Sequence, residues 1–274
     1  MAKPTILTFH GSGSNDTIHS LRRVFSIYLV FLGHTPMSKK KTSTNSMQTG
    51  PIESAAGPGV LPFFDGCGPF YRWVPPSEAL SAAKMRDLST LTTELLPEVS
   101  SLVKSAVANA KARGSEVVGV IGFSQGTRVV AGLLKAAQIR RELLKEGKAE
   151  GLEWCDFKFG VSVCSSFPPP LVPVEVVEAV KKCGLDEARQ KEMLEAKITL
   201  PAIHMLGKQD EWRWAGKLLI ESAYEVESEP KDEVEKGKNG VFEFVMGHHY
   251  PVQSEDTEKV ANWVIGTWEE TKGL

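Results

Sequence analysis

The chain has 274 residues, of which 42% are hydrophobic and 24% charged, and its formal net charge is -2. This composition is that of an ordinary globular protein, and the length suits one α/β domain with a large core. The charge balance gives no reason to expect nucleic acid or an anionic membrane surface as a partner.

The N-terminus and the cysteines bear on where the protein works. The sequence MAKPTILTFHG lacks the pattern of a signal peptide, and no apolar run reaches the ~20 residues of a membrane span. No C-x-x-C spacing occurs, so the cysteines predict neither a zinc site nor a redox pair. We therefore expect a cytoplasmic protein with free thiols at four positions: Cys67, Cys155, Cys164 and Cys183.

Short β-type apolar runs alternate with helical patterns along the chain. This alternation predicts an α/β fold, a mostly parallel sheet with helices on both faces. The predicted strands are 5–9, 116–123, 157–163, 198–206 and 241–245. The predicted helices are 87–112, 127–146, 211–224 and 254–271. We expect a single domain over residues 1–274.

Two segments interrupt this alternation. Residues 165–197 contain a proline run and two short helical patterns, too much for a simple connection. We interpret them as a lid or substrate wall inserted into the domain, the alternative being a decorated surface loop. Residues 33–59 are polar and include a run of three lysines; a second strand is expected there, but the pattern does not place one.

The pentapeptide Gly122-Phe123-Ser124-Gln125-Gly126 fits the G-x-S-x-G pattern of a nucleophile elbow. An apolar run leads into it and a helical pattern leads out, which is the strand-turn-helix setting that the elbow requires. A strained turn exposes the serine, and the flanking glycines allow strand and helix to pass closely. Ser124 is thus predicted to be a nucleophile.

A serine hydroxyl needs a base and a carboxylate that orients it, and α/β-hydrolases place these after the serine in the order acid, histidine. Asp210 and Glu211 follow a predicted strand, and we favour Asp210 because Glu211 is better placed to start a helix. After the last predicted strand come His248 and His249, and either fits the base.

These residues and the stretch HGSG, which begins at His10, all follow predicted strands. The carboxyl ends of parallel strands meet at one edge of the sheet, where ligands bind. HGSG is therefore expected to form an oxyanion loop. Its two donors would be the backbone N–H groups of Ser12 and Gln125.

The constellation predicts a serine hydrolase that cleaves an ester or thioester through an acyl-enzyme on Ser124. It implies no metal or organic cofactor. Apolar residues of the insertion and of residues 63–73 suggest an apolar acyl pocket. From these we select Phe70, Trp73 and Phe167 as substrate-binding residues.

Five stretches resemble the fungal serine hydrolase (FSH) family of α/β-hydrolases. They are ILTFHGSGSN, GPGVLPFFDGCGPFYRW, GFSQGTRVVAGLL, PAIHMLGKQDEW and GHHYP, in this order over nearly the whole chain. The resemblance implies the α/β-hydrolase fold and esterase or thioesterase activity, with many fungal members in polyketide or other secondary-metabolite pathways. It implies Ser124 as nucleophile and Asp210 as triad acid. The family's final motif resembles G-H-x-x-P, which favours His248 as base.

The chain departs from the family at residues 24–50. Members that resemble it have a helix and then an apolar strand there, whereas this segment is polar and rich in lysine. We hypothesise that an altered exon boundary explains the difference. A missing strand would weaken the sheet near the site, so a binding module without catalysis is a rival to the enzyme. The substrate alternatives are a small carboxylic ester and an acyl thioester on a carrier protein.

Overall fold

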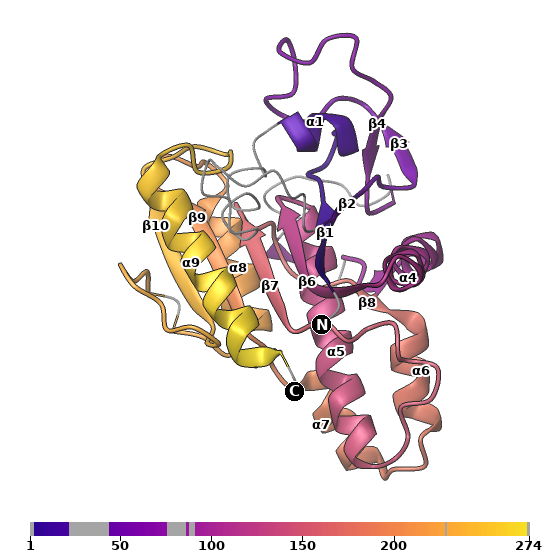
Figure 1. Cartoon of the computed structure of the whole chain (residues 1–274). Coiled ribbons are helices and arrows are strands. Elements are labelled where there is room, and N and C mark those ends of the chain that lie inside the picture. The colour runs from indigo at the N-terminus through magenta and orange to yellow at the C-terminus, as the bar shows by residue number, and fades with distance from the viewer. Residues whose placement is uncertain (1–2, 22–43, 76–85, 88–90, 228, 273–274) are drawn as a thin grey trace.

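A six-stranded parallel sheet forms the centre of the protein (Figure 1). The structure is a computed structural model that describes residues 3–21, 44–75, 86–87, 91–227 and 229–272. The strand order is β10-β9-β7-β6-β1-β2, and every neighbouring pair is parallel. The strands are β1 (Lys3–Phe9), β2 (Thr44–Gln48), β6 (Ser115–Phe123), β7 (Phe159–Val163), β9 (Ala202–Gly207) and β10 (Gly240–Phe244).

Strand β2 lies between residues 33 and 59, where a strand was expected but the sequence pattern did not place one. Residues Thr44 to Gln48 pair in parallel with Thr5 to Phe9 at the edge of the sheet. An edge strand has one neighbour only, and TNSMQ carries no apolar run that could have shown it. The sheet therefore has the strand that the departure from the family seemed to remove. Residues 22–43, which include the lysine run and most of the segment that departs from the family, lie outside the described residues.

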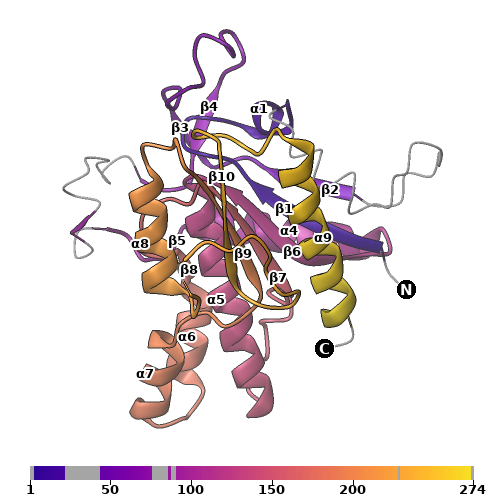
Figure 2. The same cartoon turned by 90° about the vertical axis from the view of Figure 1, so that its left-hand side faces the viewer.

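Helices cover both faces of the sheet, as the alternation predicts (Figure 2). Leu7 and Phe9 of β1 join one core, and Ile6 joins the other, because successive side chains of a strand point to opposite faces. Helix α9 closes the second core with Trp263. The main helices are α4 (Pro97–Ala112), α5 (Gly126–Lys145), α8 (Arg213–Ala223) and α9 (Ser254–Thr271).

Smaller elements decorate the sheet. A short helix, α1 (Asp16–Leu21), follows β1, and β3 (Ile52–Ser54) pairs antiparallel with β4 (Phe70–Arg72) above the edge of the sheet. Strand β5 (Glu94–Leu95) pairs in parallel with β8 (Val172–Pro173). No helix among the described residues is both long and apolar enough to cross a membrane.

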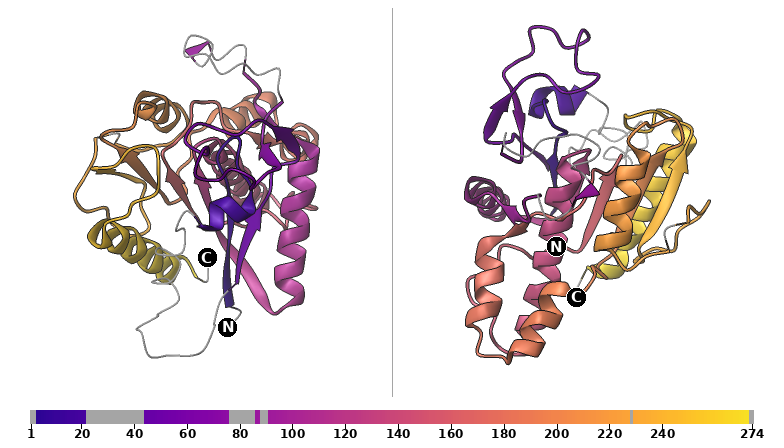
Figure 3. Two further views of the ribbon diagram at one scale, coloured as in Figure 1. Left: turned by 90° about the horizontal axis from the view of Figure 1, so that it is seen from above. Right: turned by 180° about the vertical axis from the view of Figure 1, so that it is seen from behind.

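Residues 165–197 form β8 and two helices, α6 (Val174–Lys182) and α7 (Glu187–Glu195). Both helices lie along the C-terminal half of α5 (Figure 3). Val176 and Val180 of α6 are buried in the core with α5, and Arg189 of α7 pairs with Glu142 of α5 at 2.9 Å. The helices pack on the body of the domain, and only the start of this segment approaches the candidate site.

Candidate active site

Ser124 stands in a tight turn between β6 and α5. Its backbone φ is 49°, in the left-handed region that residues other than glycine rarely adopt. The flanking glycines are sterically required, since a Cβ on Gly122 would lie 2.5 Å from the carbonyl oxygen of Gly126, and a Cβ on Gly126 would lie 2.3 Å from that of Phe9. The G-x-S-x-G pattern thus reflects the close passage of strand, turn and helix, the geometry of a nucleophile elbow.

The structure brings the three predicted catalytic residues together at one edge of the sheet. His248 Nε2 lies 3.0 Å from Ser124 Oγ, and His248 Nδ1 lies 2.9 Å from Asp210 Oδ2. These residues follow β10, β6 and β9 respectively. His249 points elsewhere: its Nδ1 lies 2.8 Å from the carbonyl oxygen of Tyr250. The hydrogen-bond chain can pass the serine proton to an imidazole whose charged form a carboxylate stabilises.

Asp210 is held as an ionised partner of His248. Its side chain is only 2% exposed, and burial alone would raise its pKa. The hydrogen bond and charge interaction with His248, together with the N–H that Trp212 donates to Oδ1 at 2.9 Å, keep the pKa of Asp210 below its ordinary value. Both carboxylate oxygens therefore have donors, which fixes the carboxylate plane toward His248.

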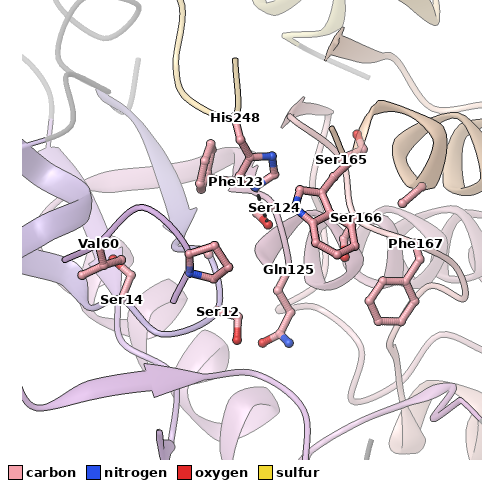
Figure 4. Close-up of a pocket in the computed structure, with 14 residues that line it drawn as sticks. Ser12, Ser14, Val60, Phe123, Ser124, Gln125, Ser165, Ser166, Phe167 and His248 are labelled. Atoms are coloured by element: carbon pink, nitrogen blue, oxygen red, sulfur yellow. Dashed lines mark hydrogen bonds between the residues drawn. The ribbon is translucent and has the colours of Figure 1, made fainter. Parts of the chain in front are cut away.

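The HGSG stretch forms a loop directly beside Ser124. A Cβ on Gly11 would lie 2.9 Å from Phe123 Cδ1 and 3.3 Å from the Cβ of Ser124, so glycine gives the loop its close approach to the elbow. Figure 4 shows His248 on one side of Ser124, and Ser12 and Gln125 on the other. The backbone N–H groups of Ser12 and Gln125 have no acceptor within the described part of the chain. They are free to donate to a substrate oxygen.

His10 and Trp73 hold this loop from beneath. The Gly50 N–H donates to His10 Nε2 at 2.9 Å, so Nδ1 carries the ring proton and donates to the Gly11 carbonyl at 2.7 Å. Trp73 Nε1 donates to the His10 carbonyl at 2.7 Å, and its backbone N–H donates to Gln125 Oε1 at 2.8 Å. Burial lowers the pKa of His10 to about 4, so the ring is neutral.

The pocket in front of Ser124 is mainly apolar, and no Asp, Glu, Lys or Arg among the described residues lines it. Phe167 lines it as predicted, after Ser165 and Ser166 at the start of the inserted segment. The other two residues predicted to bind substrate, Trp73 and Phe70, are not among those that line this pocket. Trp73 is fully buried and packs edge-on against Phe9 at a ring distance of 5.4 Å, and Phe70 lies in β4 outside the pocket lining.

Several residues of the site were missed by sequence reasoning. Pro58 and Val60 line the pocket, as do Trp212, just before α8, and Ala215 in its first turn. Trp212 lies two residues after Asp210, and that spacing in GKQDEW was the available signal. Val60 had none, because its place depends on how residues 57–69 fold back over the sheet.

A cysteine lies behind the acid and the base. One side-chain ligand atom each of Cys164, Asp210 and His248 lies within 4.8 Å of those of the other two. These residue types also bind transition metals. Here, however, Asp210 and His248 bond to each other, and we assign no metal to them.

Comparison with known proteins agrees with this geometry. The family model described as Serine hydrolase (FSH1) matches residues 1–260. The chain belongs to this family. The resemblance of the five sequence stretches and the expectation of an enzyme are thereby confirmed, and the parallel sheet with its elbow is an α/β-hydrolase fold.

Two relatives of the FSH hydrolase illustrate the range of the family. Esterase FUS5 of Gibberella moniliformis is 28% identical over 271 residues, covering 97% of this chain and 88% of the relative. Thioesterase FSL2 of Gibberella zeae is 24% identical over 273 residues, covering 97% and 93%. Among solved structures, the chain is similar to esterase PE8, with 15% identity, 96% and 93% coverage and a TM-score of 0.45.

Proposed function

We propose that this FSH hydrolase cleaves an ester or thioester through a covalent acyl-enzyme on Ser124. The observation that carries the proposal is the continuous chain of hydrogen bonds from Ser124 through His248 to Asp210. That chain begins beside two free backbone N–H groups and opens onto an apolar pocket.

The mechanism follows from the positions of the donors and acceptors. His248 Nε2 takes the proton of Ser124 as Oγ attacks the acyl carbon, and Asp210 stabilises the imidazolium that forms. The N–H groups of Ser12 and Gln125 donate to the oxygen that becomes negative. The imidazolium then protonates the departing alcohol or thiol, and water repeats these steps to release the acid.

The lining of the pocket supports an uncharged, apolar acyl group as substrate. A carboxylate or phosphate buried against Val60, Phe167 and Trp212 would lose its hydration without gaining a cationic partner from the described lining. The serine hydroxyls and backbone groups near Ser124 leave room for uncharged polar substituents close to the reacting carbon.

We propose a thioester substrate alongside a carboxylic ester, because one relative is an esterase and another a thioesterase. The resemblance to the family further supports a polyketide or other secondary-metabolite acyl group, free or bound to a carrier protein. The alternative of a catalytically impaired binding module was based on a missing strand. Strand β2 pairs with β1 at the edge of the sheet, so that reason no longer applies.

A fluorophosphonate probe tests the reaction. The wild-type protein should be labelled covalently, and Ser124→Ala should abolish the label. Folded wild-type protein that takes up no label would refute the proposed function. Turnover of acyl thioesters of N-acetylcysteamine, compared with aryl esters of the same acids, then separates the two substrate classes.

A further inference from the structure

Tyr250 lies two residues after the proposed base, in the loop that follows β10. The residue is only 2% exposed, whereas Val252, two residues further on, is 61% exposed. A tyrosine buried in a surface loop takes a polar hydroxyl into the protein, which costs free energy unless the hydroxyl is hydrogen-bonded. The partner of that hydroxyl therefore shows which part of the protein the loop is attached to.

The hydroxyl pairs with a histidine of α1. Tyr250 Oη lies 3.1 Å from His19 Nε2, and both residues are 2% exposed. Helix α1 follows the HGSG loop, and its start is fixed by Asn15, whose Oδ1 accepts the N–H of Ile18 at 2.9 Å. The hydrogen bond therefore joins the loop of the base to the segment that carries the proposed oxyanion donor Ser12.

The ring of Tyr250 packs against the residue that precedes the nucleophile. It stacks on Phe123, with ring centroids 5.2 Å apart and an angle of 24° between the planes. Phe123 in turn contacts the imidazole of His248, with centroids 5.1 Å apart, and lies beside it in Figure 4. Aromatic rings at these distances attract one another. The imidazole therefore packs on a ring that Tyr250 itself supports.

The loop is restrained on each side of His248. Before the base, the Gln209 N–H donates to the Met246 carbonyl at 3.1 Å. After the base, Tyr250 provides the contacts just described. The imidazole between them is 25% exposed, yet its Nε2 must stay within reach of Ser124 Oγ, 3.0 Å away. A misplacement of about 1 Å at a reacting group can cost roughly a hundredfold in rate, so a restraint on this loop bears on the reaction.

We propose that Tyr250 is a positioning residue for the base of this hydrolase. Its hydroxyl, bonded to His19, fixes the loop that carries His248, and its ring supports Phe123 against the imidazole. Tyr250 is not among the residues that line the pocket, and it acts through His248. This inference rests on the proposed function, because it takes His248 as the base toward Ser124.

Tyr250→Phe removes the hydroxyl but keeps the ring, so it tests the hydrogen bond alone. With an aryl ester, kcat should fall about threefold or more, the effect of one lost hydrogen bond on the placement of the base. KM should stay within about twofold, because the pocket lining is intact. A smaller fall in kcat, or a loss that appears in KM instead, would overturn the proposal.

Tyr224→Phe is the matched control. That tyrosine is 1% exposed and also packs against a histidine, His204, with ring centroids 4.4 Å apart. It lies at the end of α8 and does not line the pocket. The control should keep the kcat of the wild type, and a fall equal to that of Tyr250→Phe would contradict a specific role for Tyr250.

A double-mutant cycle connects the effect to His19. His19→Leu should also lower kcat. The double variant with Tyr250→Phe should lose less than the product of the two single losses, because both changes remove the same hydrogen bond. A loss as large as that product would show that the two residues act separately and would overturn the proposal.

Fluorophosphonate labelling of Ser124 separates slower chemistry from a loss of folded protein. Tyr250→Phe should reach the same final stoichiometry of label as the wild type, with a rate constant lower by about threefold or more. A wild-type rate at lower stoichiometry would indicate unfolding and overturn the proposal. If the wild type takes up no label, the proposed function fails; if both proteins are labelled equally fast, only the role of Tyr250 fails.

Discussion

The buried ring of His10 should make the stability of the protein depend on pH. His10 accepts from Gly50, just past β2, and donates to Gly11 in the loop beside Ser124. Protonation would turn its accepting nitrogen into a donor that faces the Gly50 N–H. Burial also removes water from the ring, which disfavours its charged form and lowers the pKa of His10 from 6.5 to about 4.

The sign and size of the effect follow from the two pKa values. In the unfolded chain the ring takes up a proton as pH falls through about 6.5, while the folded protein stays unprotonated until about pH 4. Protons then favour the unfolded state, so the stabilising contribution is complete above pH 6.5 and falls as pH drops toward 4. Between pH 7 and pH 5 the loss amounts to about 2 kcal/mol.

Urea denaturation of the wild type and His10→Asn at pH 7, 6 and 5 measures this contribution. The variant should be less stable at pH 7 by about 1 to 2 kcal/mol, because the Gly50 N–H loses its acceptor. That difference should shrink by about 2 kcal/mol at pH 5. Burial also lowers the pKa of His204, to about 3, but that ring is present in both proteins and cancels.

If the free energies of unfolding of the wild type and His10→Asn run parallel from pH 7 to pH 5, the ring is not buried and neutral as described.

Three further predictions concern the base, the pocket and the packing of α5. His248→Ala should reduce kcat by on the order of 10^4-fold while His249→Ala spares most of it, and the reverse ranking in steady-state kinetics would reassign the base. Phe167→Ala should raise KM several-fold for a long-chain ester but not for an acetate ester; equal changes for both would remove Phe167 from acyl recognition. Gly132→Ala should destabilise the protein by about 3 kcal/mol or more, since the new Cβ would lie 1.6 Å from the Leu171 carbonyl oxygen. An unchanged urea midpoint would contradict that clash.

The central strands and the chemistry at their ends were predictable from local patterns. Strands β6 and β7 are buried on both faces and therefore read as continuous apolar runs. Glycines must stand at both ends of the elbow for steric reasons, so five residues are enough to recognise it in the sequence. Because parallel strands share one edge, locating the strand ends was enough to bring Ser124, Asp210 and His248 together.

Features that depend on contacts between distant segments were not predictable. Strand β2 exists because Thr44 to Gln48 lie beside β1, not because they are apolar. We selected Trp73 as a pocket residue from its apolar surroundings in the sequence. In the structure its indole donates to the His10 carbonyl, packs against Phe9 and lies in the core. The helices of residues 165–197 have amphipathic patterns, but these patterns do not identify α5 as the helix against which they pack.

Trp73 has one further consequence, for the time course of the reaction. The Trp73 side chain donates a hydrogen bond to the His10 carbonyl, in the loop beside Ser124. Its backbone N–H donates to the side chain of Gln125, the residue after Ser124. Trp73 thereby links the two segments that carry the oxyanion donors, Ser12 and Gln125, before substrate binds. When enzyme and substrate are mixed rapidly, acylation should therefore begin without a lag, since no slow isomerisation is needed to bring the two oxyanion donors together.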